Sequence, residues 1–302
     1  MSYRIRPGKS LSGEFRRVAR HQYTMAIDIL THQPDGPDEA IHDARKCFKR
    51  LRGLIRLVGD VAPEFRDNEN ARVRDIARTL ASARDATALV EALDRLIVSE
   101  ATAANHDSLF AIHARLAERR DRIAAEETGI EDRIAAAITG CEDGIKALHH
   151  LRLPGKRRKA TAVLARGAAK NYGRAVSALA RAGASSNPDD WHDLRKRIKY
   201  HRMHVQLLST AWPGEMGLRA EIADLAGEAL GDDHDLTSLD ALIAADPAAI
   251  GTDDEIAILR RCMAARSARL HDQVHAIVTN LLKDDRRVVE SRIAALWHDA
   301  AG

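Results

Sequence analysis

Apolar residues recur at steps of three and four along most of the 302-residue chain, which is the period of an amphipathic α-helix. No alternating stretch is followed by a hairpin signal, so strands are not expected. Proline and glycine clusters separate the periodic stretches and predict the connections between helices. These clusters are His32–Asp38, Gly59–Phe65, Ser185–Asp190 and Ala211–Gly217. The pattern predicts an all-α protein.

The polar face of the segment Ile41–Val58 is strongly basic. At 100° per residue, five side chains follow one another along one face over roughly 21 Å. They are His42, Arg45, Lys49, Arg52 and Arg56. Asp43 is the one acidic residue in the segment, so these cations lack the nearby carboxylates that usually stabilise a solvent-exposed helix face. Taken alone, the stripe fits an anion-binding face and a solvated surface equally well.

The basic segment occurs twice. The sequence IHDARKCFKRLR at Ile41–Arg52 returns as WHDLRKRIKYHR at Trp191–Arg202, 150 residues later. The identities fall mostly on the polar face, whereas core positions change, as where Cys47 is replaced by Arg197. A purely solvated face is not expected to keep its identities while the core varies, so the repeat favours a functional face.

A second pair of segments has the same offset. LASARDATAL at Leu80–Leu89 corresponds to LGDDHDLTSL at Leu230–Leu239, which matches Asp85 with Asp235. Both aspartates are interpreted as a structural pair that anchors cationic side chains. Pro154 and Gly155 then mark a boundary between two repeats, 1–150 and 151–302.

Each repeat is predicted to hold about four main helices. The last part of each is a long helical region, Asp107–His150 in the first repeat and Asp253–Trp297 in the second, and glycines at 129, 140 and 144 interrupt the first of these. We expect two four-helix bundles related by a pseudo-two-fold axis, with the two basic stripes facing a shared central cleft or pore.

Composition narrows the classes of function. The formal net charge is only +3, with 47 Lys and Arg against 44 Asp and Glu, so a uniformly basic nucleic-acid-binding surface is not indicated. Cys47, Cys141 and Cys262 are odd in number and widely spaced, which predicts buried free thiols. No signal peptide or membrane-spanning segment is evident, so a cytoplasmic location is expected.

The paired signatures resemble the two halves of the CHAD family, the conserved-histidine α-helical domain. The resemblance covers nearly the whole chain and includes the opening YRIRPGKSLSGEFRRVAR. It implies two four-helix bundles around a basic central pore that binds inorganic polyphosphate, often with targeting to polyphosphate granules. It therefore implies a binding protein without catalytic residues, cofactor or metal, and partners that are polyphosphate, granule proteins or a separate polyphosphate-metabolising enzyme.

The resemblance also implies which residues bind, carried over by position. The implied polyphosphate ligands are His42, Arg45, Lys49, Arg52, Arg56, His192, Arg195, Lys199 and Arg202, with Lys46 and Lys196 at the rim. Candidate supporting residues are Arg16, Arg20, Arg74, Arg78, Arg84, Arg166 and Lys170. The sequence departs from the family pattern at Gln206, which stands where Arg56 stands in the first repeat, and at Ala81, where the second repeat has Gly231.

Two other functions compete with this interpretation. A cationic helical channel could also bind the backbone of a nucleic acid or another polyanion, although the chain offers few aromatic side chains for base stacking. His-Asp dipeptides invite comparison with metal-dependent phosphohydrolases, but the cations around His42 and His192 would repel a metal ion. No glycine-rich phosphate loop or serine nucleophile motif is present.

Overall fold

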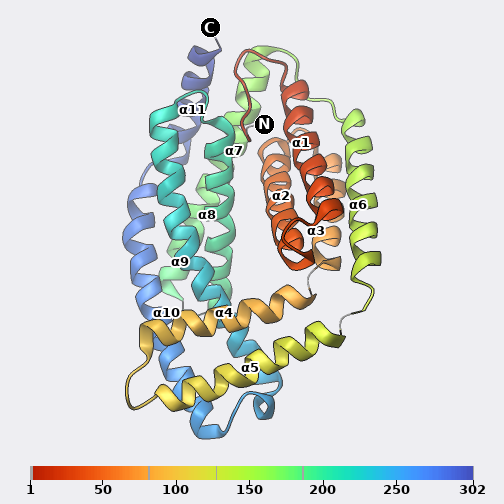
Figure 1. The fold of residues 1–302 in the computed structure, drawn as a ribbon. Coiled ribbons are helices and arrows are strands. Elements are labelled where there is room, and N and C mark those ends of the chain that lie inside the picture. The colour runs from red at the N-terminus through yellow and green to blue at the C-terminus, as the bar shows by residue number, and fades with distance from the viewer. Residues whose placement is uncertain (1–2, 81, 127, 186, 302) are drawn as a thin grey trace.

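The structure is a computed structural model that describes residues 3–80, 82–126, 128–185 and 187–301, without the side chains of residues 82–85. Helices connected by short loops make up this part of the chain, and it contains no strand. The helices are α1 (Leu11–His32), α2 (Pro37–Val58), α3 (Pro63–Thr79), α4 (Ser82–Glu100), α5 (His106–Glu126), α6 (Ile130–Ala147), α7 (Arg157–Ala184), α8 (Pro188–Leu208), α9 (Pro213–Ala245), α10 (Asp253–Leu281) and α11 (Arg286–Ala300), with short 3-10 turns η1 (Leu148–His150) and η2 (Pro247–Ala249). The all-α prediction is confirmed (Figure 1).

Prolines explain where several of the helices begin. α2, α3, α8 and α9 each begin at a proline, whose fixed φ suits the first helical turn and whose missing N–H would be unpaired there anyway. The four connections predicted from proline and glycine clusters all fall between helices or at a helix start. Cys47, Cys141 and Cys262 are free and buried, as the sequence predicts.

In the first half of the chain, α1, α2, α3 and α6 pack around one core (Figure 1). Phe15, Phe48 and Leu51 are almost completely buried there. Gly140 and Gly144 lie inside α6 and do not interrupt it, contrary to the sequence expectation. A Cβ at Gly144 would overlap the ring of Tyr23, so this glycine allows α1 and α6 to approach closely.

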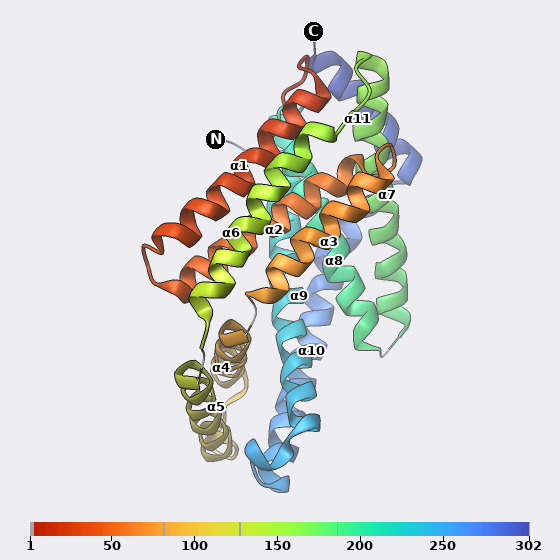
Figure 2. The same ribbon diagram turned by 90° about the vertical axis from the view of Figure 1, so that its right-hand side faces the viewer.

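The other two helices of the first half, α4 and α5, pack mainly on the second half. They form a hairpin against α9 and α10, below the first bundle in both views (Figures 1 and 2). Ion pairs hold this contact: Arg95 of α4 meets Asp232 of α9 at 3.0 Å, and Arg115 of α5 meets Glu255 of α10 at 2.9 Å.

The helices of the two halves correspond at the offset of about 150 residues. α1 corresponds to α7, α2 to α8, α5 to α10 and α6 to α11, while α3 and α4 together match the 33-residue α9. In the first half α3 ends at Thr79 and α4 begins at Ser82, whereas α9 passes through Gly231 without a break. The described chain has six helices before residue 150 and five after it, more than the roughly four per half that the sequence predicts.

The two halves meet where α2 crosses α7 and α8. His204 Nε2 lies 3.1 Å from the carbonyl oxygen of Gly53, and a Cβ on Gly53 would come within 2.7 Å of Met203 Sδ. At Gly167 of α7 an added Cβ would overlap the Leu57 carbonyl. Gly167 is therefore required by close approach of the α7 and α2 backbones, and Gly53 makes room for the Met203 side chain.

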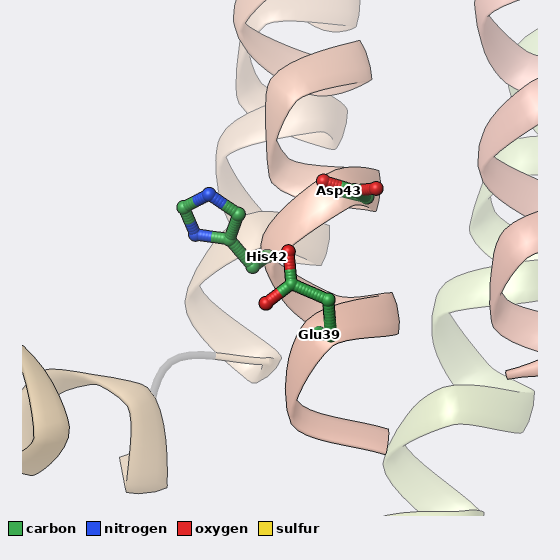
Figure 3. A group of neighbouring side chains, drawn as sticks. All are labelled: Glu39, His42 and Asp43. Carbon is green, nitrogen blue, oxygen red and sulfur yellow. The ribbon is translucent and has the colours of Figure 1, made fainter. Parts of the chain in front are cut away.

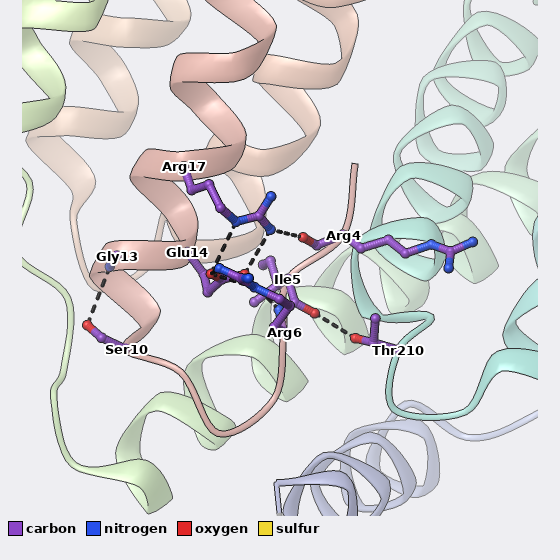
Figure 4. A network of polar contacts seen from close by, with 8 residues as sticks. All are labelled: Arg4, Ile5, Arg6, Ser10, Gly13, Glu14, Arg17 and Thr210. Carbon is purple, nitrogen blue, oxygen red and sulfur yellow. Dashed lines mark hydrogen bonds and ion pairs between the residues drawn. The ribbon is translucent and has the colours of Figure 1, made fainter. Parts of the chain in front are cut away.

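The N-terminal segment ties the end of α8 to α1 (Figure 4). The Ile5 amide donates to the Leu207 carbonyl at 2.8 Å, and the Thr210 hydroxyl donates to the Ile5 carbonyl at 2.6 Å. Arg6 and Arg17 both donate to the buried carboxylate of Glu14. Burial opposes the charge of Glu14, but the hydrogen bonds from Arg6 and Arg17 outweigh it and lower its pKa to about 2.

Candidate functional site

A cleft of about 440 Å³ lies between α2, α8 and α9, with Arg95 of α4 at its edge. Both copies of the repeated signature contribute to its wall: Lys46, Lys49 and Arg50 come from α2, and Lys199 and Arg202 from α8. Gln206 also lines it, at the position that matches Arg56 of the first half. Cations 150 residues apart in sequence thus share one cavity.

Lys199 is the most perturbed cation of the cleft. It is half-buried, and this burial is the main cause that lowers its pKa to about 7. The positive charges of Arg195 and Lys49 act in the same direction, and Asp235 only partly offsets them. Burial likewise lowers the pKa of Arg195. Burial and the neighbouring cations therefore both disfavour the charged form of Lys199.

Carboxylates of α9 line the opposite side of the cleft. Asp232 and Asp235 pair with Arg95, at 3.0 and 2.8 Å, and Asp224 pairs with Arg202 at 2.7 Å. Burial raises the pKa of Asp235, while Arg95 and Arg195 oppose that rise. The sequence interpretation of Asp235 as an anchor for cations agrees with this geometry. The side chain of its counterpart Asp85 is outside the described residues.

His192 starts the α8 stripe beside the cleft and contacts a second histidine. Its Nδ1 lies 3.1 Å from Nδ1 of His234 on α9, so one ring donates and the other accepts. Burial, helped by Lys196 and Arg195, lowers the pKa of His192, and burial lowers that of His234 to about 4. Both imidazoles are therefore neutral near pH 7, and neither contributes the charge expected of a histidine that faces a polyanion.

The remaining implied ligands do not line the cleft. The charge of Arg195 helps to lower the pKa of Lys199, and Lys196 is exposed, 3.9 Å from Asp193. Further along α2, Arg52 is half-buried, and Arg56 lies over the Tyr200 ring at 4.6 Å from its centroid. Arg56 lines a separate groove that α7 and α8 border. His42 and Arg45 are half-buried at the start of the α2 stripe.

The candidate supporting residues lie away from the cleft. Arg16 donates to the carbonyls of Leu148 and Leu151, at the end of α6. Arg20 is exposed on α1, and Arg74 and Arg78 are exposed on α3, where both pair with Asp75. Arg166 is 3.8 Å from Glu290, and Lys170 pairs with Asp60 at 2.6 Å. Arg84 has a side chain outside the described residues.

One group of side chains in the described chain has the spacing of metal ligands. Ligand atoms of Glu39, His42 and Asp43 lie within 4.8 Å of one another on the first turns of α2 (Figure 3). Lys46 already donates to Asp43 at 2.7 Å, and Glu39 is exposed. Exposed acidic groups commonly lie this close without an ion. We therefore assign no metal here, and a metal-free protein stays a prediction.

Sequence reasoning missed several residues of the site. Arg50 and Arg95 line the cleft, and His234 contacts His192. His234 stands next to Asp235 inside the second repeated segment, so that repeat offered a signal for it. Arg95 lies outside the repeated segments, so no motif in the sequence indicated its role. It reaches the cleft only because α4 packs on α9.

Comparison with known proteins identifies the family. A family profile described as the CHAD domain matches residues 25–244, and the chain belongs to that family. The CHAD domain from the plant Ricinus communis has a similar structure, with a TM-score of 0.63 and 17% identity over 94% of this chain and 95% of that one. PptA from Streptomyces chartreusis has a TM-score of 0.59 and 17% identity, over 92% and 100% of the two chains. At these identities the two structures show a shared fold.

A search of curated proteins found no match. No helix in the described part of the chain is long and apolar enough to cross a membrane.

Proposed function

We propose that this protein binds inorganic polyphosphate in the cleft between α2 and α8 and catalyses no reaction on it. One observation carries the proposal: Lys49 and Lys199, from the two copies of one sequence signature, line the same cavity. The charge of Lys49 is one of the causes that lower the pKa of Lys199 to about 7. A bound polyanion would relieve this repulsion and keep both lysines protonated.

The chemistry of the cleft suits a chain of phosphates. Arginine donates in pairs to phosphate oxygens, and lysine supplies a mobile positive charge. Polyphosphate has no bases, so its recognition needs no stacking platform, and aromatic residues make up only 4% of the chain. The relation of the CHAD family to polyphosphate supports the same ligand. The rival ligand is a nucleic-acid backbone, which offers phosphates at a different spacing.

The proposal includes the symmetry expected from sequence. The correspondence of α2 with α8, and of α3 and α4 with α9, supports two related halves around a pseudo-two-fold axis. On this view the cleft is one part of a central basic pore. We further propose that the protein acts in the cytoplasm at polyphosphate granules, beside a separate enzyme that makes or degrades the polymer.

A binding titration tests the proposed function. Wild type and the Lys49→Gln/Lys199→Gln variant are titrated with long-chain polyphosphate, with tripolyphosphate and with single-stranded RNA of matched charge, at several salt concentrations. The control is Lys9→Gln/Lys146→Gln, which removes two exposed lysines outside the cleft. We expect wild type and control to prefer long polyphosphate over RNA, and the cleft variant to lose about tenfold or more in affinity.

The outcomes separate the candidate functions. Equal and steeply salt-dependent binding to polyphosphate and RNA would indicate a general polyanion surface. Binding that the cleft variant retains in full would refute the assignment of the cleft. Circular dichroism and thermal unfolding of both variants check that neither substitution disturbs the helices.

A further inference from the structure

A second groove, larger than the cleft, has Arg56 of α2 in its wall. It has a volume of about 810 Å³ and lies between α7, α8 and the start of α11. A smaller groove of about 300 Å³ continues it toward the end of α2, and both are lined by Arg56, Lys170, Arg174 and Arg197. The two grooves form one surface, which we call the α7 groove.

Cations outnumber carboxylates in the α7 groove. Its larger part is lined by Arg56, Lys170, Arg174, Arg181, Arg197 and Arg286. Its acids already have partners: Asp193 pairs with Arg181 and Arg197, at 2.8 and 2.9 Å, and Asp284 pairs with Arg292 at 2.8 Å. The third acid, Asp285, caps the N-terminus of α11. The carboxylates of this groove therefore leave some of its guanidinium groups uncompensated.

Three arginines of the groove have no carboxylate partner within the described chain: Arg56, Arg174 and Arg286. Exposed arginines such as Arg174 and Arg286 are common on protein surfaces and prove little by themselves. Arg56 differs, because its Nε is buried and has no hydrogen-bond acceptor there. The Nε of Arg197 is also buried without a hydrogen-bond acceptor. Buried donors without acceptors are costly, so a guanidinium group that already has one gains more from an anion that accepts from its other N–H groups.

Residues of one helix, α2, line both the cleft and the groove. Lys49 lines the cleft and Arg56 lines the α7 groove, two turns or about 10 Å further along the same helix face. Arg52 lies between them, and its Nε is also buried without an acceptor. The Arg56 guanidinium carbon lies 4.6 Å from the centroid of the Tyr200 ring, and this cation–π contact orients the guanidinium.

We propose that the α7 groove is a second phosphate-binding surface, which takes the part of a long polyphosphate chain that extends beyond the cleft. This inference rests on the proposed function and adds chain-length selectivity to it. A short chain fills only the cleft. A long chain gains the contacts of Arg56, Arg174 and Arg286 as well, and its affinity rises with the number of phosphates that reach them.

The test compares two charge-matched double variants. Arg174→Gln/Arg286→Gln removes two unpaired cations from the groove. Arg158→Gln/Arg287→Gln removes two exposed cations from the same two helices, α7 and α11, but outside the groove. Each variant and wild type are titrated with tripolyphosphate and with polyphosphates of graded length at several salt concentrations.

We expect the groove variant to lose about tenfold in affinity for long chains, with a fall of about two in the slope of log affinity against log salt. Its affinity for tripolyphosphate should equal that of wild type, and the control should match wild type for every chain length. Long-chain affinity and salt slope that stay at the level of wild type in the groove variant, or that fall equally in the control, would overturn the inference alone. Failure of wild type to bind any polyphosphate would instead overturn the proposed function, and the inference with it.

Discussion

Lys49 on α2 and Lys199 on α8 line one cleft, although 150 residues separate them, and the charge of Lys49 contributes to the low pKa of Lys199. Like charges in a half-buried cleft destabilise the folded protein, and the proposed polyanion ligand would relieve this repulsion. The consequences can be measured with and without that ligand.

In the free protein, Lys199→Gln should increase the free energy of unfolding. Folded Lys199 loses its proton near pH 7, whereas unfolded lysine keeps it to about pH 10.5. Between these values the unfolded state binds more protons, so the contribution of this group to stability rises with pH. The gain from the substitution should be largest below about pH 7 and should vanish toward pH 10.5. Urea unfolding measures it; Lys9→Gln serves as the control, and destabilisation at about pH 6 would contradict the argument.

Polyphosphate binding should be accompanied by proton uptake. The polyanion favours the charged form of Lys199, so affinity should fall as pH rises from about 6 to 8. Lys199→Arg keeps the charge throughout this range and should show a weaker dependence. Calorimetric titration in buffers of different ionisation enthalpy counts the protons. The same pH dependence in wild type and Lys199→Arg would assign it to another group.

Gly167→Ala should destabilise the protein by about 1–3 kcal/mol, because the new Cβ would overlap the Leu57 carbonyl where α7 meets α2. Gly183 provides the matched control on the same helix. A Cβ there meets no atom within 4 Å, so Gly183→Ala should be neutral or stabilising by about 0.5–1 kcal/mol. Denaturant unfolding compares the two, and equal effects would show that the α2–α7 contact is not as close as described.

Arg16→Gln should lower stability without changing polyphosphate affinity. Arg16 donates to Leu148 O at 3.1 Å and to Leu151 O at 2.6 Å, which satisfies carbonyls after α6. Loss of these charge-assisted hydrogen bonds should cost about 1–3 kcal/mol. Thermal unfolding and a binding titration are done on the same variant. A loss of affinity at unchanged stability would restore Arg16 to the binding residues.

Glu14→Gln should reduce the dependence of stability on acid pH. The pKa of Glu14 is lowered from 4.5 to about 2, so its contribution is complete above about pH 4.5 and is lost as pH falls toward 2. Wild type should therefore lose stability over this range more steeply than the variant. Unfolding by urea across this pH range measures the difference, and parallel curves would mean that Arg6 and Arg17 do not hold this carboxylate.

Much of the fold follows from sequence because its signals are local. The helix period, the prolines at the starts of α2, α3, α8 and α9, and the repeated basic signature each depend on neighbouring residues. The prediction that Gly140 and Gly144 interrupt a helix failed because tertiary packing against Ile76 and Tyr23 makes small residues favourable inside α6. Local propensity alone cannot register such a contact.

The site was predictable only in part for the same reason. The repeat identified Lys49 and Lys199, because both copies of the signature carry a lysine there. Arg95, Arg174 and Arg286 belong to no repeated motif, and only the packing of α4, α7 and α11 on their neighbours brings them to the cleft or the groove. Residues that only tertiary packing brings together show no helical period or repeated motif in a single sequence.

Because of the α4–α5 hairpin, the duplicated sequence does not divide into two independent folding units. Leu93 and Leu96 of α4 are almost fully buried, and α4 packs on α9 and α10 of the other half. A polypeptide ending at residue 150 would lose the contacts of α4 and α5 with α9 and α10, and one starting at 151 would uncover the partner faces of α9 and α10. The first repeat thus places its α4–α5 hairpin on the second, and we expect the two repeats to unfold as one cooperative unit.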